Sequence, residues 1–334
     1  MAALFPSGRA GVTLARAKAR SATLTKEYEI VVIGGGIAGF SAALAAARLG
    51  RQTLVLTGET LGGHLITIEK IDGYPGFEDG VPGFDLCPIV QEQAETAGAE
   101  TAMASVTSLE RDGDSWHIVT PPESYHAKCV IIATGTKLRK LNVPGETKLH
   151  GKGVSQCASC DAPLLRNQAV VVAGGGDSAL QEALTLADHC SKVTIVHHGA
   201  KLKAQAAYRT LAEAADKIEF IADAEVTEVL GDEAVTGVKI KHLGSGDASE
   251  IECAAIFGFI GLEPNAGFLA DNSLVDDTGA VLTDALLRTR QTGLLAAGTV
   301  RAGSIGRAAA AAGEGAAAAL AADRFLSDGA WRSD

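Results

Sequence analysis

Hydrophobic residues gather in short runs along the chain, and the first run leads into a glycine-rich turn and an alanine-rich segment. Residues 28–50, YEIVVIGGGIAGFSAALAAARLG, form the pattern of a strand, a tight turn and a helix that ends at Gly50. The turn places Gly34, Gly36 and Gly39 in the spacing Gly-x-Gly-x-x-Gly. Such glycines let backbone N–H groups approach a pyrophosphate, and the helix N-terminus favours its negative charge. The pattern predicts a dinucleotide-binding unit.

Two further apolar runs extend this unit into a sheet. Residues 52–59, QTLVLTGE, have the pattern of a second strand, and residues 129–136, CVIIATGT, that of a buried strand running into a turn. An acidic side chain is expected at the ribose about 20 residues after the glycine turn. A threonine ends the second strand, and Glu59 is the nearest carboxylate. We therefore expect Glu59, with Thr134 and Gly135 of the later turn, at the cofactor.

A second strand, turn and helix follow at residues 168–187, QAVVVAGGGDSALQEALTLA. The turn carries Gly174, Gly176 and Ala179 in the same spacing. The two turns are too far apart in the chain for one mononucleotide repeat, so they imply two domains and two dinucleotides. Further strand candidates continue the second unit at residues 192–198, 218–230, 234–243 and 254–261.

The C-terminal pattern is a strand, a glycine-rich bend and a long helix of small residues, over residues 293–326. Alanine favours the helix, and small side chains permit close approach by a flat ring or by another helix. An ordinary buried helix explains the same composition, so both interpretations stay open.

Charge and cysteine content limit the partners. The 29 Lys and Arg residues against 40 Asp and Glu give a net charge of −11, which disfavours nucleic acid and membrane surfaces as partners. The apolar runs are interrupted and fall short of a spanning helix. Four cysteines are scattered without motif spacing, which predicts reduced thiols and a soluble, cytoplasmic protein; they are Cys87, Cys129, Cys190 and Cys253.

The first 26 residues differ in composition from the rest, because they contain basic residues and no acidic residue before Glu27. A disordered extension or an upstream start codon explains this composition, and so does a cleaved organelle transit peptide. We expect an extension over residues 1–26 and a folded chain that begins near Tyr28.

The segment GVSQCASCDAPL places Cys157 and Cys160 three positions apart, followed at once by Asp161. A zinc site needs a second pair of ligands, and the sequence has no other Cys-x-x-Cys. The neighbouring His197 and His198 would point to opposite faces of a strand. A redox pair explains the aspartate better, because disulfide exchange needs an attacking thiolate and a proton source for the leaving sulfur. Burial near a flavin would suit Asp161 to that role.

From about Tyr28 to Leu326 these motifs, in this order, resemble the low-molecular-weight thioredoxin reductases, which are flavoprotein disulfide reductases. The resemblance rests on the two glycine turns, GGHL with IDGYPGF, ATG, CASCD, GLEPN and LLAAGT with AAGEGAAAAL. It implies an α/β fold of two Rossmann-like, three-layer ββα domains, the second inserted into the first. Residues 27–138 and 266–334 would bind FAD, and residues 139–265 would form an NAD(P)-binding-like domain that carries the cysteine pair.

The resemblance also implies a homodimer, and a large rotation that lets the dithiol meet the flavin and the partner disulfide in turn. Cys160 would contact the flavin, and Cys157 would attack thioredoxin or another disulfide or dithiol substrate. The residues implied at FAD are Gly34, Gly36, Gly39, Glu59, Gly63, His64, Thr134, Gly135, Gly298, Thr299, Arg307, Ala308 and Ala309.

Departures from the family pattern leave the electron donor open between NADPH, NADH and neither. Family members that use NADPH have His-Arg-Arg-x-x-x-Arg, where this chain reads VHHGAKLKA, with His198 and Gly199 at the two arginines and Lys203 at the last. Each lost arginine contact is worth about 1.5–3 kcal/mol. KLKA resembles NADH-linked alkyl hydroperoxide reductase flavoproteins. On the FAD side, His64 and Ala308 replace glutamines.

A further departure there is Thr299, where relatives have aspartate, and it predicts an altered flavin environment. For the second dinucleotide we expect Gly174, Gly176, Ala179, His198 and Lys203.

The leading hypothesis is an FAD-dependent disulfide reductase. Alternatives are a dithiol oxidase that uses oxygen, a reductase fed by ferredoxin or another protein, and a flavin-binding redox sensor with little turnover.

Overall fold

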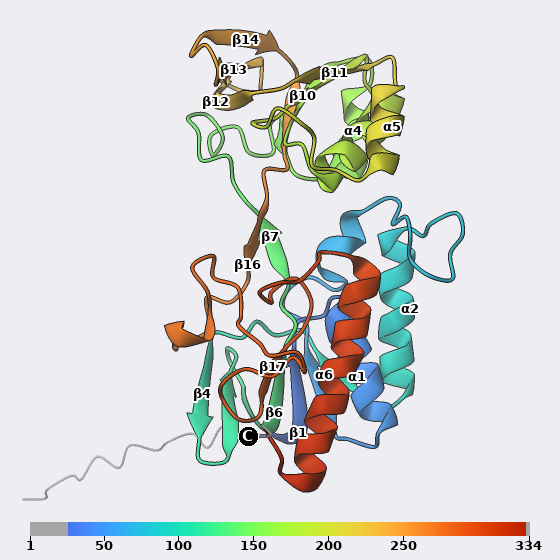
Figure 1. Cartoon of the computed structure of the whole chain (residues 1–334), viewed down its shortest axis with the longest axis vertical. Helices are drawn as coiled ribbons and strands as arrows, with labels where there is room; N and C mark the ends of the chain where they lie inside the picture. Colours follow the sequence, from blue (N-terminus) through green and yellow to red (C-terminus); the bar gives the residue numbers. More distant parts are fainter. Residues whose placement is uncertain (1–25, 332–334) are drawn as a thin grey trace, which may run out of the picture.

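In the computed structural model, which describes residues 26–331, the chain forms two bodies joined by a pair of short strands (Figure 1). The expected extension, residues 1–26, lies outside the described residues except for Lys26, which begins strand β1 (Lys26–Ile33). The larger body is built from both ends of the described chain, and the smaller one from its middle. No helix in residues 26–331 is long and apolar enough to cross a membrane.

The larger body is a seven-stranded sheet in the order β3-β2-β1-β6-β5-β4, with β17 beside β6. Its parallel strands are β1, β2 (Thr53–Leu56), β3 (Glu100–Ala102), β6 (Ser124–Ile132) and β17 (Leu294–Ala296). An antiparallel hairpin, β4 (Ser108–Asp112) and β5 (Ser115–Val119), adds the edge next to β6. The crossing back from β6 to β17 brings the C-terminal segment into the first sheet.

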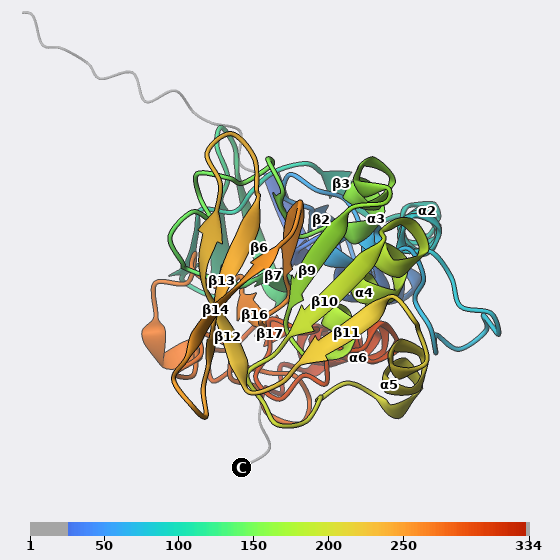
Figure 2. The same cartoon turned by 90° about the horizontal axis from the view of Figure 1, so that it is seen from above.

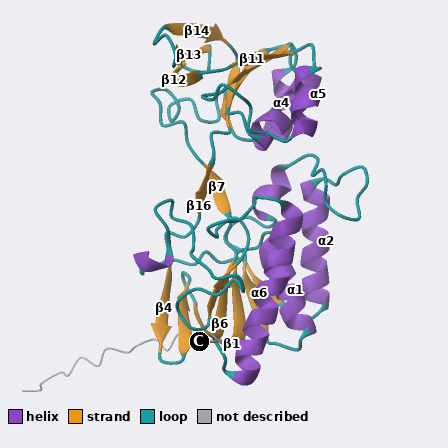
Figure 3. Cartoon of the chain, viewed as in Figure 1, coloured by secondary structure: helices purple, strands orange, loops and turns teal. Residues whose placement is uncertain are grey.

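Three helices cover one face of this sheet: α1 (Ile37–Arg48), α2 (Gly83–Thr96) and α6 (Ala308–Asp328) (Figure 3). The second half of β1, residues 30–33, is apolar and buried because both of its faces are covered. Ile30 and Val32 face the core under the helices, whereas Val31 and Ile33 face a second core with Trp116 of the hairpin.

The smaller body has a parallel sheet in the order β11-β10-β9-β15-β8. These strands are β8 (Val154–Ser155), β9 (Ala169–Ala173), β10 (Lys192–Val196), β11 (Ile218–Ile221) and β15 (Ala255–Gly258). Helices α4 (Asp177–His189) and α5 (Ala206–Glu213) pack on one face (Figure 2). The antiparallel sheet of β12 (Ala224–Leu230), β13 (Gly237–His242) and β14 (Ala248–Glu252) packs on the other. This gives the predicted three-layer ββα arrangement.

The two bodies are connected by β7 (Thr136–Leu138) and β16 (Leu262–Pro264), which pair antiparallel. An ion pair of 3.0 Å joins Lys137 to Glu263 across these strands, and Arg139 donates to the carbonyl of Leu262 at 3.0 Å. The remaining short helices are α3 (Ala158–Asp161) and the 3-10 turns η1 (Gly63–Thr67), η2 (Ala162–Leu165) and η3 (Asn272–Leu274).

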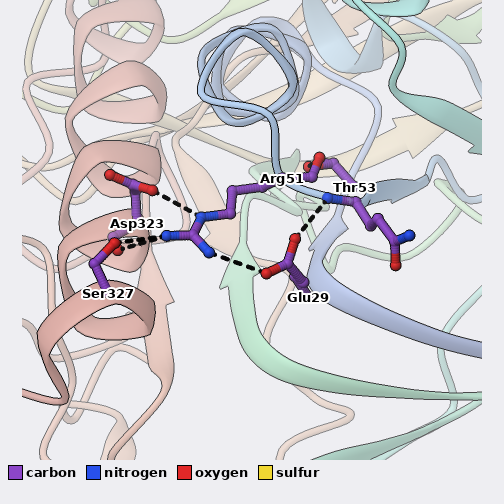
Figure 4. Close-up of polar contacts among 6 residues, drawn as sticks. Glu29, Arg51, Thr53, Asp323 and Ser327 are labelled. Carbon is purple, nitrogen blue, oxygen red and sulfur yellow. Dashed lines mark hydrogen bonds and ion pairs between the residues drawn. The ribbon is translucent and has the colours of Figure 1, made fainter.

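Arg51 ties the C-terminal half of α6 to the first sheet (Figure 4). Its guanidinium lies 2.7 Å from a carboxylate oxygen of Asp323 and 3.0 Å from one of Glu29. It also donates to the hydroxyl of Ser327 at 2.6 Å. These partly buried charges fix the last helix on strands from the other end of the chain.

Candidate active site

A cavity of about 520 Å³ lies at the carboxyl ends of the parallel strands in the larger body. Ligands of open α/β sheets bind at this edge, because the connections there separate. The cavity is lined by many of the residues predicted at FAD, namely Gly34, Gly36, Glu59, Gly63, His64, Thr134, Gly135, Gly298, Thr299, Arg307 and Ala308. Gly39 and Ala309 do not line it.

The first glycine turn forms one wall of the cavity. Gly34 has φ +120°, and a Cβ there would stand 2.2 Å from the carbonyl oxygen of Ala133. A Cβ on Gly39 would stand 1.9 Å from the carbonyl oxygen of Gly34. Gly36 opens α1, with open space where its side chain would be. The turn therefore brings bare backbone and a helix N-terminus to the cavity, as a pyrophosphate requires.

The opposite wall is the turn after β17. Glu314 of α6 accepts the backbone N–H of Gly298 at 2.7 Å and pairs with Arg301 at 2.5 Å. Next to Gly298, the hydroxyl of Thr299 lies 3.2 Å from that of Thr136 in the connecting strand. Glu314 thus holds the turn that presents Thr299 to the cavity. This role of Glu314 was not predicted, although the residue lies in the AAGEG motif.

Two more cavity residues, Asn265 and Phe268, were not predicted. Asn265 follows the GLEP segment and exchanges two hydrogen bonds with Thr134, at 2.7 and 3.1 Å. This exchange ties the Ala-Thr-Gly turn to the second connecting strand. The GLEPN motif was the available signal for it.

His64 stands in η1 and lines the cavity, and part of its side chain is exposed. Desolvation by the surrounding protein lowers the pKa of His64. The neutral imidazole is therefore the favoured form near pH 7. It can donate or accept a hydrogen bond at the position where the family resemblance implies glutamine.

These walls fit a dinucleotide. The cavity combines a glycine turn that a Cβ would fill, a helix N-terminus and the exposed carboxylate of Glu59 on the strand-end loop expected at a ribose. Small residues of α6, Ala308 and Ala311, line it as well. Further along that helix, a Cβ on Gly315 would stand 2.1 Å from the carbonyl oxygen of Ala38. Small residues of α6 thus lie both beside the cavity and against α1.

Cys157 and Cys160 form a disulfide at the start of α3 in the smaller body. The Sγ of Cys157 accepts the backbone N–H of Cys160 at 3.3 Å, and Cys160 is exposed. Asp161 is partly exposed, and neither it nor the cysteines line the cavity. In this arrangement of the two bodies the condition of burial near a flavin is not met, and the role of Asp161 as the acid of the redox pair stays a prediction. The four other cysteines are free and buried.

The helix after the second glycine turn, rather than the disulfide, reaches the first cavity. Gly174 has φ +137°, and a Cβ there would stand 2.3 Å from the carbonyl oxygen of Phe259. Ser178, in the first turn of α4, lines the cavity. Beside it, Asp177 pairs with Arg307 of the larger body at 2.5 Å. The N-terminus of α4 and the first cavity therefore open toward each other.

The residues at the predicted nucleotide clamp divide into buried and exposed. His197 is buried, and its Cβ lies 3.0 Å from where a Cβ on Gly175 would stand. His198 and Lys203 are exposed, and the backbone N–H of Lys203 donates to the carbonyl of Gly175 at 2.8 Å. His197 therefore packs the turn, whereas the side chains of His198 and Lys203 are free to meet a ligand.

Glu182 was also missed by the sequence analysis. It lies on α4 behind the disulfide, and its Oε2 accepts the backbone N–H of Ala158 at 2.9 Å. Burial, with a smaller effect of the charge of Glu69, raises the pKa of Glu182 to about 7. No signal in one sequence separates such a carboxyl from the other acidic residues of a helix.

Comparison with known proteins agrees with this geometry. The family model described as pyridine nucleotide-disulphide oxidoreductase matches residues 28–315. The thioredoxin reductase of Treponema pallidum is 38% identical over 303 residues, which are 90% of this chain and 97% of that protein.

Two solved structures of thioredoxin reductases match most of this chain. That of Lactococcus lactis, in the FR conformation, matches with a TM-score of 0.88 at 38% identity, covering 90% of this chain and 99% of that one. That of Streptococcus pyogenes matches with a TM-score of 0.61 at 36% identity, covering 91% and 99%. The chain belongs to the pyridine nucleotide-disulphide oxidoreductase family and is a thioredoxin reductase-like flavoenzyme within it.

Proposed function

We propose that this protein is an FAD-dependent disulfide reductase that passes electrons through Cys157 and Cys160 to thioredoxin or another disulfide. The observation that supports it best is the disulfide at the start of α3, exposed at Cys160, in a chain with two dinucleotide-type glycine turns. Related proteins that match nearly their whole length are thioredoxin reductases.

FAD is proposed to bind in the cavity of the larger body, so that residues 27–138 and 266–334 form the FAD-binding domain. The Gly34–Gly36 turn would hold the pyrophosphate, Glu59 the ribose, and His64 and Thr299 the ring system. Bound FAD would supply two-electron transfer between a nicotinamide and a disulfide. Glu314 would keep the Gly298 turn in place against it, through the N–H that it accepts.

Residues 139–265 are proposed to bind the electron donor at the N-terminus of α4, through Gly174, Gly176 and Ala179. This helix end already opens toward the cavity, so a nicotinamide held there would face the flavin. Because His198 and Gly199 stand at the arginine positions of NADPH-using relatives, we propose that discrimination against NADH is weak. Lys203 is then the side chain left to meet a 2′-phosphate.

Electron transfer to the disulfide requires a different arrangement, because the cysteines do not line the cavity. We propose a rotation of the smaller body about the strand pair β7 and β16. Two thioredoxin reductases of similar identity and coverage match this chain with TM-scores of 0.88 and 0.61, as expected if relatives adopt different arrangements.

After the rotation, Cys160 is proposed to meet the flavin and Cys157 to attack the substrate disulfide. Asp161, next to Cys160, would return the proton that the leaving sulfur needs. Both cysteines and the aspartate lie within one turn of chain, so the rotation would carry them as a unit.

A homodimer in the cytoplasm is also proposed. An open groove between α1 and α6 is lined by Leu44, Leu49, Ala312 and Leu320, and Leu320 is 56% exposed. A second copy of the chain would cover this apolar groove. Sedimentation at micromolar concentration tests it, and Leu320→Glu should then give monomers.

The decisive experiment is anaerobic reduction of the FAD-loaded protein, followed by flavin absorbance. NADPH, NADH and dithiothreitol are added separately. Rapid bleaching by a nucleotide supports the reductase and identifies its donor. Bleaching by dithiothreitol alone contradicts a nucleotide donor, and favours a protein donor or thiol oxidation.

A further inference from the structure

The carboxyl of Glu182 lies directly behind the disulfide turn. Its Oε2 is 2.9 Å from the backbone nitrogen of Ala158, the residue that follows Cys157. Ala158 is fully buried, so water cannot replace this acceptor. A buried N–H left without a partner is costly. Glu182 therefore fixes the first residue of α3 and, with it, the position of the pair.

Glu182 has little to offset its own loss of hydration. No cation pairs with it among residues 26–331. Burial is the main cause that raises the pKa of Glu182 to about 7, the Ala158 N–H acts in the opposite direction, and Glu69 raises it further.

The charged groups around Glu182 come from several elements. The loop after η1 meets α4 through a hydrogen bond from Gln181 to the carbonyl of Lys70. On the neighbouring elements, the charged residues are Asp161 on α3, Arg209 and the exposed Glu213 on α5, Glu69, Lys70 and Asp72 on the loop, and Lys192 and Glu219, which pair with each other, on β10 and β11. Glu69 is the one whose charge acts on the pKa of Glu182.

We propose that Glu182 is the positioning residue of the redox pair and takes up one of the two protons that accompany reduction of the disulfide. This inference rests on the proposed role of Cys157 and Cys160, but not on the identity of donor or substrate. A thiolate on Cys157, whose chain neighbour Ala158 donates its N–H to this carboxylate, would add a second negative charge near the first. Uptake of a proton by Glu182 removes that repulsion.

The reduction balances with an external dithiol as the electron source. The S–S bond of the protein breaks, the dithiol closes to its own disulfide, and its two sulfurs give up two protons. One proton ends on a cysteine sulfur and the other on Glu182, which leaves the second sulfur as a thiolate. Cys157 can be that thiolate, because its Sγ accepts the N–H of Cys160 at 3.3 Å. When Glu182 is already protonated, the second proton goes to solvent.

The test is the equilibrium of the FAD-loaded protein with buffers of reduced and oxidised dithiothreitol at pH 6, 7 and 8. Thiols are trapped by alkylation and counted by mass. At pH 6 the carboxyl is largely protonated, so Glu182→Gln should match the wild type. At pH 8 the variant should be reduced about tenfold more readily, which corresponds to about 30 mV for this two-electron couple.

Glu213→Gln, on the exposed face of α5, is the matched control and should follow the wild type at every pH. Glu69→Gln removes a charge that raises the pKa of Glu182, so this variant should diverge from Glu182→Gln at a lower pH than the wild type does. Compared with the wild type, Glu69→Gln also tests the inference if Glu182→Gln does not fold. A shift of Glu182→Gln that is equal at all pH values, or absent at pH 8, overturns the inference. The inference is also overturned if Asp161→Asn, rather than Glu182→Gln, gives the pH-dependent difference from the wild type.

This equilibrium needs neither a nucleotide nor thioredoxin. A protein that no nucleotide reduces, but whose Glu182→Gln variant diverges at pH 8, would lack the proposed donor and keep the proton role. If NADPH reduces the protein rapidly but the wild type and Glu182→Gln give the same titration curves, the proposed donor is supported and the proton role of Glu182 is rejected.

Discussion

The same substitution at two glycines of α6 should change stability in opposite directions. Gly313 is exposed, and no atom of residues 26–331 outside its chain neighbours and helix backbone lies within 4 Å of its missing Cβ. Gly315 is buried, and its Cβ would stand 2.1 Å from the carbonyl oxygen of Ala38 in α1. Both sites gain helix propensity from alanine, but Gly315→Ala also forces two packed helices apart.

The magnitudes follow from these two effects. Gly313→Ala should stabilise the protein by about 1 kcal/mol, which is the propensity difference within a helix. Overpacking costs about 1–3 kcal/mol, and a clash with backbone belongs at the upper end. We therefore expect Gly315→Ala to destabilise by about 2 kcal/mol after the propensity gain of about 1 kcal/mol is subtracted.

Urea unfolding of the FAD-loaded proteins measures both changes, with far-UV circular dichroism reporting the helices. Release of FAD gives a second signal, because Ala308 and Ala311 at the start of the same helix line the cavity. Unfolding free energies that change in the same direction for both variants would refute the packing argument.

Other predictions concern charge and the donor. Arg51→Met should lower the unfolding free energy by about 2 kcal/mol, because it leaves Asp323 and Glu29 partly buried without their cation. The control Lys217→Met should lower it less, because the Nζ of Lys217 donates to a single backbone carbonyl. Lys203→Glu should raise the KM for NADPH more than that for NADH, and equal changes would remove Lys203 from phosphate binding. Burial raises the pKa of Glu182 above its unfolded value, so its folded form binds more protons and stability should fall as pH rises from about 4.5 to 7. Glu182→Gln should remove about 2 kcal/mol of that pH dependence, measured by urea unfolding at pH 5 and 7.5.

The glycine turns were predictable from sequence because their constraint is local. Gly34 and Gly174 both need positive φ and a bare backbone, and the strand and helix on either side are visible in the apolar pattern. The α/β fold class is confirmed for the same reason. The stretch at residues 218–230 shows the limit, since it contains two strands separated at Asp223, which has φ 50°. The hairpin β4–β5 was missed because both strands are only five residues long and β4 is mostly polar.

The missed residues of the site depend on contacts between distant segments. Asn265 meets Thr134, and Glu182 meets Ala158, only once the chain is folded. The partial exposure of Asp161 depends on how the two bodies are arranged, which strand and helix patterns do not encode. The sequence also could not decide whether the small residues of α6 lie against a flat ring or against another helix, because this too depends on contacts between distant segments. Along its length, Ala308 meets the cavity and Gly315 meets α1.

The contacts between the two bodies are compatible with the proposed rotation because each is small. The hydroxyl of Ser159, between the cysteines, donates to the carbonyl of Thr67 at 3.0 Å, and Arg307 pairs with Asp177 across the gap. A neutral hydrogen bond contributes about 1 kcal/mol and an exposed ion pair about 0–1 kcal/mol. If the second arrangement of the proposed rotation is held by contacts of the same size, the two would differ by little free energy and both would be populated during one catalytic cycle. Because the bond from Ser159 breaks whenever the disulfide leaves Thr67, it opposes the approach of Cys160 to the flavin, and its loss should favour the other arrangement.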